Sequence, residues 1–179
     1  MKEVIEIEKV VFGGGCFWCT EAIFLNLRGV LSARPGYAGG NVPNPTYEQV
    51  STGKSGHAEA VEIKYDSVKI KFLDLLAVFF GTHDPTTKNR QGNDTGTQYR
   101  SIIFYTNLEQ KKDAEEFIFK LKKEDGLNIV TEVEKLTKFY PAEDYHEKYY
   151  EKHKDAPYCQ IVIDPKLKKL RDNFQKLLK

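Results

Sequence analysis

Apolar residues in the first half of the chain recur with periods that alternate between those of strands and those of helices. The pattern at 10–12 is a continuous apolar run, and the helical pattern that begins at 16 is ended by Gly29. The predicted elements are, in chain order, strand 10–12, helix 16–27, strand 30–37, strand 57–65, helix 70–80 and strand 100–106. This order predicts an α+β protein built on the ferredoxin-like, split βαβ plait.

The second half of the chain adds elements to this plait. Residues 84–98 are polar and without periodicity, which is typical of a functional or mobile loop, and 39–45 is rich in turn residues. The further predicted elements are a helical turn over 46–50, helices over 108–124, 143–153 and 165–178, and strands over 129–136 and 159–163. Because we find no repeat, linker or low-complexity segment, we predict a single domain over 1–179.

The charge balance and the length of the apolar runs limit the classes of protein. Lys and Arg number 27 against 26 Asp and Glu, a net charge of +1, which argues against a nucleic-acid binder. The run 75–80 is among the longest apolar runs and is far below the roughly 20 residues of a membrane span. Residues 2–9 alternate like a strand rather than a leader. The chain is therefore predicted to be soluble and cytoplasmic, with no nucleic-acid or membrane partner.

Three cysteines are too few for a closed disulfide framework, so they are buried filler, metal ligands or catalytic thiols. Cys16 follows three glycines at a predicted strand-to-helix junction, where unpaired backbone N–H groups and the helix dipole lower the pKa of a thiol. Cys19 lies one turn along on the same side, which permits a disulfide with Cys16. We predict a reactive Cys16. The alternative is a pair of cysteines that only pack.

Four other kinds of site would use the same residues. A dinucleotide fingerprint needs a glycine where Trp18 stands. A structural zinc site needs two close ligand pairs, and one CxxC with Cys159 and scattered histidines is a weak match. A thioredoxin-like oxidoreductase also uses a CxxC, although usually later in a βαβ unit. Glu59 and Asp94 could form a glycosidase pair, but the sequence does not fix their separation.

Two polar segments carry further candidate residues. Glu59 interrupts the apolar strand 57–65, where desolvation would raise its pKa and make it a usable acid near neutrality. On the polar side of that strand it would only be solvated. Residues 91–100 form a loop dense in hydrogen-bonding groups, in which Asp94 and Tyr99 would suit the binding of a substrate oxygen. The alternative for this loop is solvation alone.

Eight short segments form an ordered set of motifs. They are Gly-Gly-Cys-Phe-Trp at 14–18, Gly-Tyr-Ala-Gly-Gly at 36–40, Asn-Pro-Thr-Tyr at 44–47, Gly-His-Ala-Glu-Ala at 56–60, His-Asp-Pro at 83–85, Arg-Gln-Gly-Asn-Asp at 90–94, Gly-Thr-Gln-Tyr-Arg at 96–100 and Phe-Tyr-Pro-Ala-Glu-Asp-Tyr-His at 139–146. With this set the chain resembles the peptide-methionine (S)-S-oxide reductases, the A-type methionine sulfoxide reductases, across 12–160. The ordered set is far more specific than any one member.

The resemblance implies a catalytic domain in which Cys16 is the nucleophile and Glu59 is the acid that protonates the sulfoxide oxygen. The positions that match the family's oxygen-binding groups are Tyr47, Tyr99 and Asp94. Those that match its apolar wall are Phe17 and Trp18. This assignment agrees with the chemistry, because a sulfoxide is a poor electrophile until its oxygen is protonated or strongly hydrogen-bonded.

The implied cycle begins with attack of Cys16 on the sulfur of methionine S-sulfoxide, free or in proteins. Methionine leaves, a sulfenic acid remains on Cys16, and a resolving thiol converts it to a disulfide that thioredoxin or a similar dithiol reduces. The resemblance implies no metal, flavin or nicotinamide cofactor.

The sequence departs from the commonest family pattern at the resolving thiol. Many members have glycine where Cys19 completes a CxxC, and many carry the resolving cysteine on a glycine-rich tail, whereas Cys159 precedes a predicted strand. Cys19 is nearer to Cys16, Cys159 fits the family position, and a relay through both is a third possibility. On the family position we favour Cys159 as the resolving thiol. The rival functions are a thioredoxin-like thiol–disulfide oxidoreductase using Cys16 and Cys19, and a non-catalytic module that binds methionine or its sulfoxide.

Overall fold

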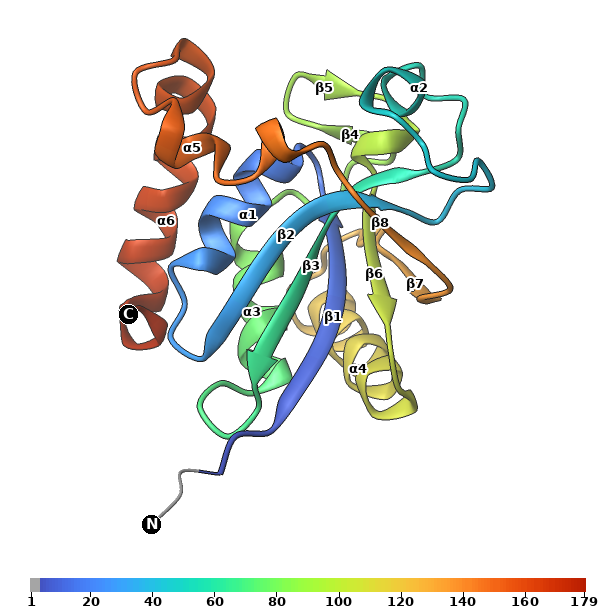
Figure 1. Cartoon of the computed structure of the whole chain (residues 1–179). Coiled ribbons are helices and arrows are strands. Elements are labelled where there is room, and N and C mark those ends of the chain that lie inside the picture. The colour runs from blue at the N-terminus through green and yellow to red at the C-terminus, as the bar shows by residue number, and fades with distance from the viewer. Residues whose placement is uncertain (1–3) are drawn as a thin grey trace.

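The computed structural model describes residues 4–179 and has a twisted six-stranded mixed sheet at its centre (Figure 1). The strand order is β7-β6-β1-β3-β2-β8. The four inner strands are β1 (Ile7–Gly14), β2 (Val30–Ala38), β3 (Ala58–Asp66) and β6 (Ser101–Tyr105), and each is antiparallel to its neighbours among these four. The predicted strands over 10–12, 30–37, 57–65 and 100–106 are therefore confirmed. Residues 1–3, which the predicted domain and the strand-like stretch 2–9 include, lie outside the described part.

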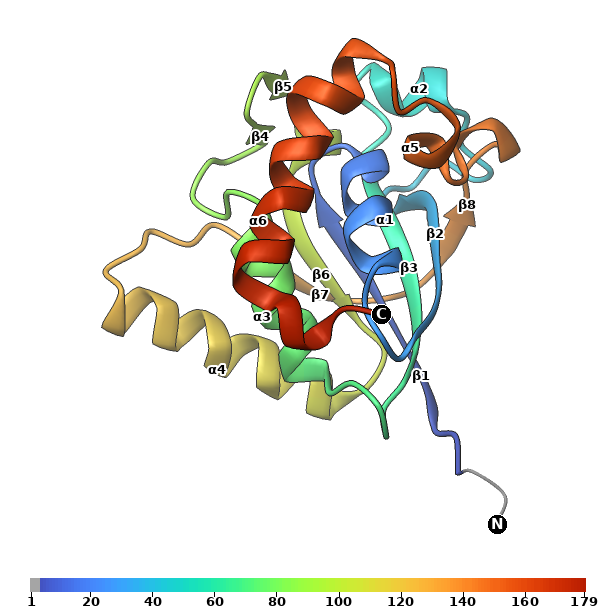
Figure 2. The same cartoon turned by 90° about the vertical axis from the view of Figure 1, so that its left-hand side faces the viewer.

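Three helices lie against one face of this sheet (Figure 2). They are α1 (Phe17–Leu25), α3 (Phe72–Thr82) and α6 (Asp164–Phe174). The main core lies between these helices and the sheet, and it includes Phe12, Phe24 and Phe79, whose rings stack or tilt against one another. A smaller core around Val11 and Phe104 lies on the other face. The fourth long helix, α4 (Leu108–Glu124), covers the predicted range 108–124.

The polar loop predicted over 84–98 contains short elements that periodicity could not reveal. Strands β4 (Arg90–Gln91) and β5 (Asp94–Thr95) form a small hairpin, and a 3₁₀ turn follows at Thr97–Tyr99. Each strand has only two residues, too few for a pattern of alternation. The hairpin nevertheless fixes where Asp94 lies.

The segment between α4 and the C-terminal helix differs from its prediction in two places. Strand β7 (Glu132–Lys135) pairs in parallel with β6, and an unpredicted three-residue strand, β8 (Phe139–Pro141), pairs with β2. The helix predicted over 143–153 is two short helices, a 3₁₀ turn at Asp144–His146 and α5 (Tyr149–Lys152). They are separated because Lys148 has a left-handed backbone with φ 51°.

The strand predicted over 159–163 is wrong. Cys159–Ile163 is a π-helical turn that continues into α6, which is followed by a 3₁₀ turn at Gln175–Leu177. Cys159 and Ile163 are buried, whereas Ile161 is 73% exposed. Burial of residues four apart is the helical pattern, and a short apolar run is ambiguous between strand and helix until its contacts are known.

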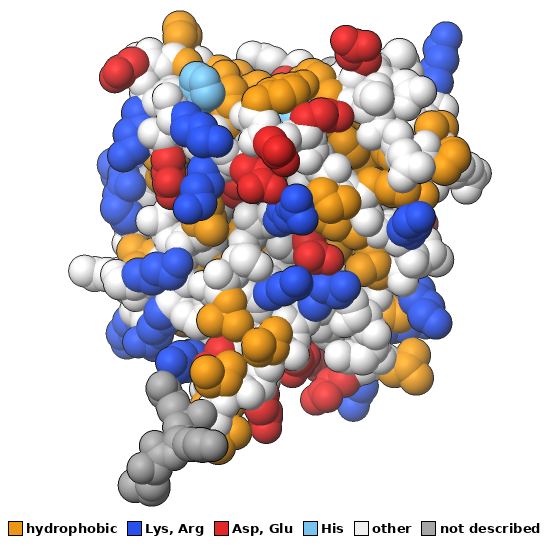
Figure 3. Space-filling view, in the orientation of Figure 1, with side chains coloured by type: hydrophobic (Ala, Val, Ile, Leu, Met, Phe, Trp, Pro, Cys, Tyr) orange, Lys and Arg blue, Asp and Glu red, His pale blue; other side chains and the backbone are white. Residues whose placement is uncertain are grey.

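The surface carries both signs of charge. On the face shown in Figure 3, basic and acidic side chains are interspersed, and hydrophobic side chains gather along the upper edge, between α5 and α2.

Helix α2 (Tyr47–Ser51) confirms the helical turn predicted over 46–50. Within residues 4–179, no helix is long and apolar enough to cross a membrane.

Candidate active site

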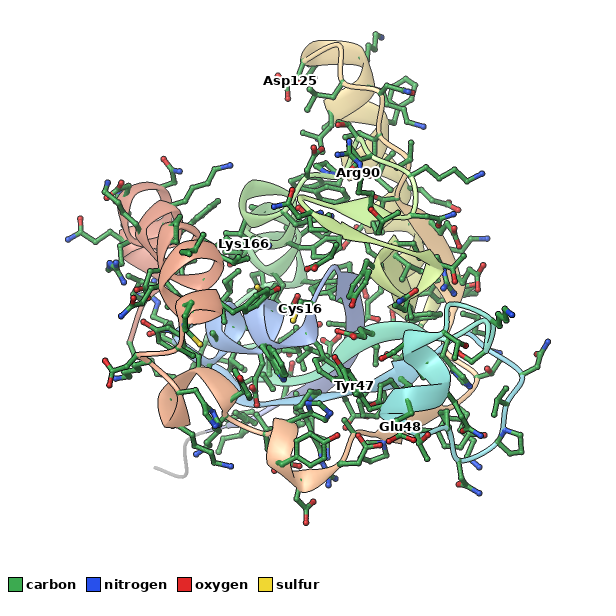
Figure 4. The ribbon with its side chains drawn as sticks, turned by 90° about the horizontal axis from the view of Figure 1, so that it is seen from above. Cys16, Tyr47, Glu48, Arg90, Asp125 and Lys166 are labelled. Atoms are coloured by element: carbon green, nitrogen blue, oxygen red, sulfur yellow. The ribbon has the colours of Figure 1, made fainter. Side chains whose placement is uncertain are left out.

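Cys16 lies at the junction of β1 and α1, where it is the N-cap residue of the helix. The preceding Gly15 has φ +92°, and a Cβ there would come within 2.6 Å of the Gln91 side chain, so only glycine fits. In Figure 4, Cys16 is central, with Tyr47 of α2, Arg90 of β4 and Lys166 of α6 around it. The predicted placement of Cys16 between a strand and a helix is confirmed. Elements from distant parts of the chain surround its thiol.

The two thiols of the CxxC are in different electrostatic environments. Burial raises the pKa of Cys16 well above its usual value, and Cys19 and Glu59 raise it further. The hydrogen bond with Cys16 lowers the pKa of Cys19 to about 7, against its burial, with help from Lys166 and Tyr158. The prediction of a lowered pKa at Cys16 is therefore wrong for the resting state, because desolvation outweighs the helix terminus. Of the two thiols, Cys19 is the one that ionises more readily in the resting site.

Glu59 is buried beside Cys16. Its side chain is 2% exposed, and its Oε2 accepts the backbone N–H of Phe17 at 3.1 Å. Burial raises the pKa of Glu59 to about 8, against the hydrogen bond from Phe17 and with a contribution from Asp94. The predicted buried position and raised pKa are confirmed, and the solvated alternative is wrong.

Three further predicted residues lie close enough to this pair to affect one another electrostatically. Burial raises the pKa values of Tyr47 and Tyr99, and the charges of Glu59 and Cys16 raise both further. Asp94 acts on Glu59 in the same way. Tyr47, Tyr99 and Asp94 therefore share one polar cluster with the nucleophile and the carboxyl, although they come from three separate elements.

The predicted apolar wall consists of aromatic rings. Phe17 is 1% exposed and lies 4.9 Å from His146 and 6.3 Å from Tyr47, measured between ring centroids. Trp18 is partly buried and stacks on Tyr149 at 3.6 Å with nearly parallel planes. Aromatic rings in this arrangement provide the apolar and sulfur–aromatic contacts that suit a methyl-sulfur group.

Sequence reasoning missed a tyrosine at the centre of the site. The Tyr158 hydroxyl donates to Asp94 Oδ2 at 3.1 Å and lies 3.9 Å from Cys19 Sγ, while its ring meets the Trp18 ring edge-on at 5.7 Å. The only sequence signal was its position directly before Cys159. Because the segment that follows it was predicted as a strand, there was no reason from the sequence to place the Tyr158 side chain near Cys16.

Cys159 is buried, like the other two cysteines. It is fully buried in the π-helical turn, and burial raises its pKa, with Asp164 and Cys19 adding to the effect. Residues 4–179 contain no group of three or more His, Cys, Asp or Glu side chains arranged to hold a metal ion.

A buried thiol pair at a helix N-terminus, beside a carboxyl that is protonated at neutral pH and inside an aromatic wall, defines a thiol-dependent oxidoreductase. The family described as peptide methionine sulfoxide reductase matches residues 8–178. The chain belongs to the peptide methionine sulfoxide reductase family.

Relatives within this family cover nearly the whole chain. The peptide methionine sulfoxide reductase MsrA of Sulfolobus acidocaldarius is 56% identical over 94% of this chain and 96% of its own. The structure of Mxr1 from Saccharomyces cerevisiae in reduced form is 31% identical, covers 86% of this chain and 90% of its own, and has a TM-score of 0.79. Mxr1 in complex with Trx2, at 20% identity and a TM-score of 0.56 over 83% of this chain and 90% of its own, is similar in fold. These structures share the mixed α/β fold with its curled sheet.

Proposed function

We propose that this chain reduces methionine S-sulfoxide, free or in proteins, to methionine, with Cys16 as nucleophile and Glu59 as acid. The observation that carries the proposal is the hydrogen bond from the Phe17 N–H to Glu59 Oε2, because it ties the residue after the thiol to a buried carboxyl. With a pKa of about 8, this carboxyl is mostly protonated at neutral pH and can donate to an oxygen. Membership of the family supports the choice of substrate.

The chemical step balances with one proton and one electron pair. The Cys16 sulfur attacks the sulfoxide sulfur while Glu59 protonates the oxygen, and the proton that Cys16 loses restores the carboxyl. The attack forms a transient bond between the two sulfurs. The oxygen then passes to Cys16 as a sulfenic acid, and both the S–O bond of the substrate and the transient S–S bond break to release the thioether. Cys16 is oxidised by two electrons and the substrate is reduced by two.

The remaining predicted residues bind the two ends of the sulfoxide group. Tyr47 and Tyr99 are held protonated by their raised pKa values, so their hydroxyls can donate to the oxygen, and Asp94 completes this polar side. Phe17 and Trp18 take the S-methyl group on the opposite, aromatic side.

We propose Cys19 as the thiol that resolves the sulfenic acid. It lies one helical turn from Cys16, it interacts with that thiol, and its pKa of about 7 makes a large fraction thiolate at neutral pH. Cys159 has a raised pKa, which disfavours it as the first attacker. The effect of Cys19 on the pKa of Cys159 supports a later relay from the Cys16–Cys19 disulfide.

Thioredoxin or a similar dithiol is the proposed reductant of that disulfide. The cycle requires two electrons from outside the chain, and a dithiol supplies them by exchange through a mixed disulfide. Support comes from the yeast relative solved with Trx2, which is similar in fold.

The ferredoxin-like plait remains our proposal for the central part of the fold. The order β6-β1-β3-β2 with antiparallel neighbours, and the crossings α1 and α3, support it. One sheet shared by all the inner strands supports a single catalytic domain over 1–179. The three free thiols support a reducing compartment, the cytoplasm.

The activity is tested by incubating the protein with dithiothreitol and each sulfoxide epimer of methionine. We expect the S epimer to be consumed and the R epimer to persist, with no turnover by the matched variant Cys16→Ser. Failure to consume the S epimer would contradict the proposal. Reduction of insulin disulfides without sulfoxide turnover would favour the rival thiol–disulfide oxidoreductase, and turnover lost in Cys16→Ser argues against the binding module.

A further inference from the structure

The motif Phe-Tyr-Pro-Ala-Glu-Asp-Tyr-His at 139–146 has no role in the mechanism above, yet it ends beside the aromatic wall. His146 is 1% exposed, and its ring lies 4.9 Å from Phe17, 4.7 Å from Tyr47 and 5.8 Å from Trp18. A histidine this deeply enclosed by substrate-facing rings has few ways to meet its hydrogen-bonding needs. The role of His146 therefore depends on the partners of its two ring nitrogens.

The hydrogen bonds fix the tautomer of His146. Trp18 Nε1–H donates to His146 Nδ1 at 3.0 Å, and an indole nitrogen can only donate. Nδ1 must therefore carry a lone pair, which leaves the ring proton on Nε2. Nε2 lies 3.2 Å from Glu143 Oε2 but makes no hydrogen bond with good geometry, so this contact is electrostatic. The neutral ring thus lies between a carboxylate on one side and the indole, to which it is hydrogen-bonded, on the other.

The same carboxylate also holds the oxygen-binding side of the site. Glu143 Oε1 accepts the backbone N–H of Tyr47 at 3.0 Å, and Oε2 accepts the Tyr37 hydroxyl at 3.0 Å. The first of these bonds anchors the start of α2, which also has a capping box at Thr46. Glu143 therefore orients His146 and Tyr47 together.

We infer that His146, oriented by Glu143, is a positioning residue that fixes the Trp18 indole and so shapes the pocket for the S-methyl group. This inference rests on the proposed function only for the identity of the group that the pocket receives. Without the Nδ1 acceptor, the indole N–H would be left without its partner, and the ring would lose the one bond that sets its rotation about the stack with Tyr149.

The inference has a consequence for pH, because an imidazolium has a proton on both nitrogens and cannot accept from Trp18. Burial lowers the pKa of His146, while Glu143 raises it. The titratable groups that face the ring are Glu143 and Tyr145 from its own turn and Tyr47 from α2. At acidic pH the bond from Trp18 is lost and the pocket loosens.

Trp18 is the only tryptophan in the chain, so its fluorescence reports this bond directly. Because burial lowers the pKa of His146, we expect the emission of the reduced, substrate-free enzyme to change at a pH below the ordinary histidine value of about 6.5. In His146→Leu the emission should differ from wild type at pH 7.5 and show no acid transition. His146→Asn offers an amide oxygen near the position of Nδ1, so it should restore the neutral-pH emission, again without a transition.

The matched control is His153→Asn. His153 is exposed and stacks on Tyr149 at 4.1 Å, so it is another histidine close to the ring on which Trp18 stacks. This variant should keep the wild-type transition and the wild-type turnover. Loss of the transition in His153→Asn would show that the transition arises from His153 and not from His146, which would overturn the inference.

Turnover gives the second measurement. His146→Leu should raise KM for methionine S-sulfoxide roughly tenfold, the size of one lost buried hydrogen bond, with kcat within about twofold. His146→Asn should recover most of this loss. An unchanged KM in His146→Leu, or wild-type emission that is flat from pH 7.5 to 4.5, would contradict the inference.

Two further outcomes are separated by design. If His146→Leu does not give a folded far-ultraviolet circular dichroism spectrum, wild type and His146→Asn are compared across pH, because only wild type has an acceptor that titrates. If no variant, wild type included, reduces sulfoxide, the proposed function fails, while the fluorescence titration still decides whether His146 holds Trp18.

Discussion

Glu59 owes its chemistry to desolvation. A carboxyl in water has a pKa near 4.5, but burial that leaves Glu59 only 2% exposed raises its pKa to about 8, against the lowering effect of the hydrogen bond from Phe17. A general acid works best when its pKa lies near the working pH, because it is then protonated and still able to give up its proton. Burial alone converts a common residue into the acid that a sulfoxide requires.

Glu59→Gln should slow sulfoxide reduction by roughly 10²–10⁴-fold at neutral pH and by less at acidic pH. In wild type the rate should fall as the pH rises through about 8, where Glu59 loses its proton. The variant lacks this group, so it relies on protonation by solvent and is relatively less impaired in acid. Initial rates with dithiothreitol from pH 5.5 to 9 measure both effects.

Glu62→Gln is the control for that measurement. Glu62 lies on the same strand but on the opposite face, where it pairs with Lys9 at 3.3 Å. Its removal should leave the pH–rate profile unchanged. A profile in Glu59→Gln that keeps the wild-type fall near pH 8 would remove Glu59 from the role of acid.

The thiol pair divides its tasks between two residues. Cys16 keeps its proton at rest because it is buried beside Glu59, and Cys19 becomes the thiolate because Cys16, Lys166 and Tyr158 stabilise its charge. A protonated Cys16 is less readily oxidised than a thiolate would be. The Cys19 thiolate is ready when a sulfenic acid forms.

Treatment with one equivalent of sulfoxide should give a Cys16–Cys19 disulfide in Cys159→Ser, as mapped by mass spectrometry. In Cys19→Ser a trappable sulfenic acid should accumulate on Cys16, because Cys159 is buried in its helical turn. A Cys16–Cys159 disulfide that forms in Cys19→Ser as fast as wild type forms its disulfide would make Cys159 the resolving thiol.

At the scale of elements, short segments carry the residues that complete the site. The β4–β5 hairpin carries Asp94, α2 carries Tyr47, and the π-helical turn follows Tyr158. None of these segments is stable alone, because a helix or strand of so few residues gains too little to offset its conformational entropy. Each depends on hydrogen bonds to distant residues, as Tyr47 does on Glu143.

Gly36→Ala tests this dependence through β8. A Cβ at Gly36 would collide with the Phe139 ring and the Tyr140 carbonyl, so β8 and the turn behind it, which carries His146, must move. We expect a loss of about 1–3 kcal/mol in unfolding free energy and a clear fall in kcat/KM. Urea unfolding and sulfoxide turnover measure the two quantities.

Gly126→Ala is the matched control, because Gly126 has φ +65° with no atom within 4 Å of an added Cβ. It should cost about 1 kcal/mol of backbone strain and leave turnover unchanged. Equal turnover in both variants would show that β8 does not position the site.

At the scale of the whole molecule, the chain buries another carboxyl that has no part in the proposed chemical step. Glu21 of α1 is 1% exposed and accepts the backbone N–H of Lys148 at 2.7 Å, which ties α1 to the start of α5. Burial raises its pKa to about 7. The folded protein therefore keeps a proton that the unfolded chain has lost by that pH.

Glu21 should make stability depend on pH with a definite sign. Its folded pKa of about 7 exceeds the unfolded value of 4.5, so its contribution is fully present below pH 4.5 and is lost as the pH rises to about 7. The difference in unfolding free energy between wild type and Glu21→Gln should fall by about 2 kcal/mol from pH 4.5 to 7.5. Taking this difference cancels opposing groups such as His83, whose pKa is lowered to about 4.

Urea unfolding at several pH values measures this difference, with Glu151→Gln as the control. Glu151 is an exposed carboxyl whose charge makes only a small contribution to the raised pKa of Glu21, so its removal should shift the pH dependence only slightly. A difference between wild type and Glu21→Gln that does not change with pH would mean that Glu21 is charged in the folded protein.

The sequence by itself determined the elements that carry a long repeat of apolar residues. The inner strands, α1, α3 and the full range of α4 follow from periodicity, because burial of one face is already encoded in the spacing of side chains. The position of Cys16 after three glycines also follows from local sequence, since the turn needs a backbone that only glycine adopts at Gly15. The ordered motifs are by themselves sufficient to indicate the family.

The tertiary structure alone decided the state of each functional group. The bond from Phe17 to Glu59 spans 42 residues and the bond from Trp18 to His146 spans 128, so no local pattern could reveal them. Desolvation raised the pKa of Cys16 against what its local sequence suggested, it decided between the buried and the solvated interpretation of Glu59, and packing turned 159–163 into a helical turn. Burial and hydrogen bonding are sums over neighbours, and the neighbours here are brought together only by folding.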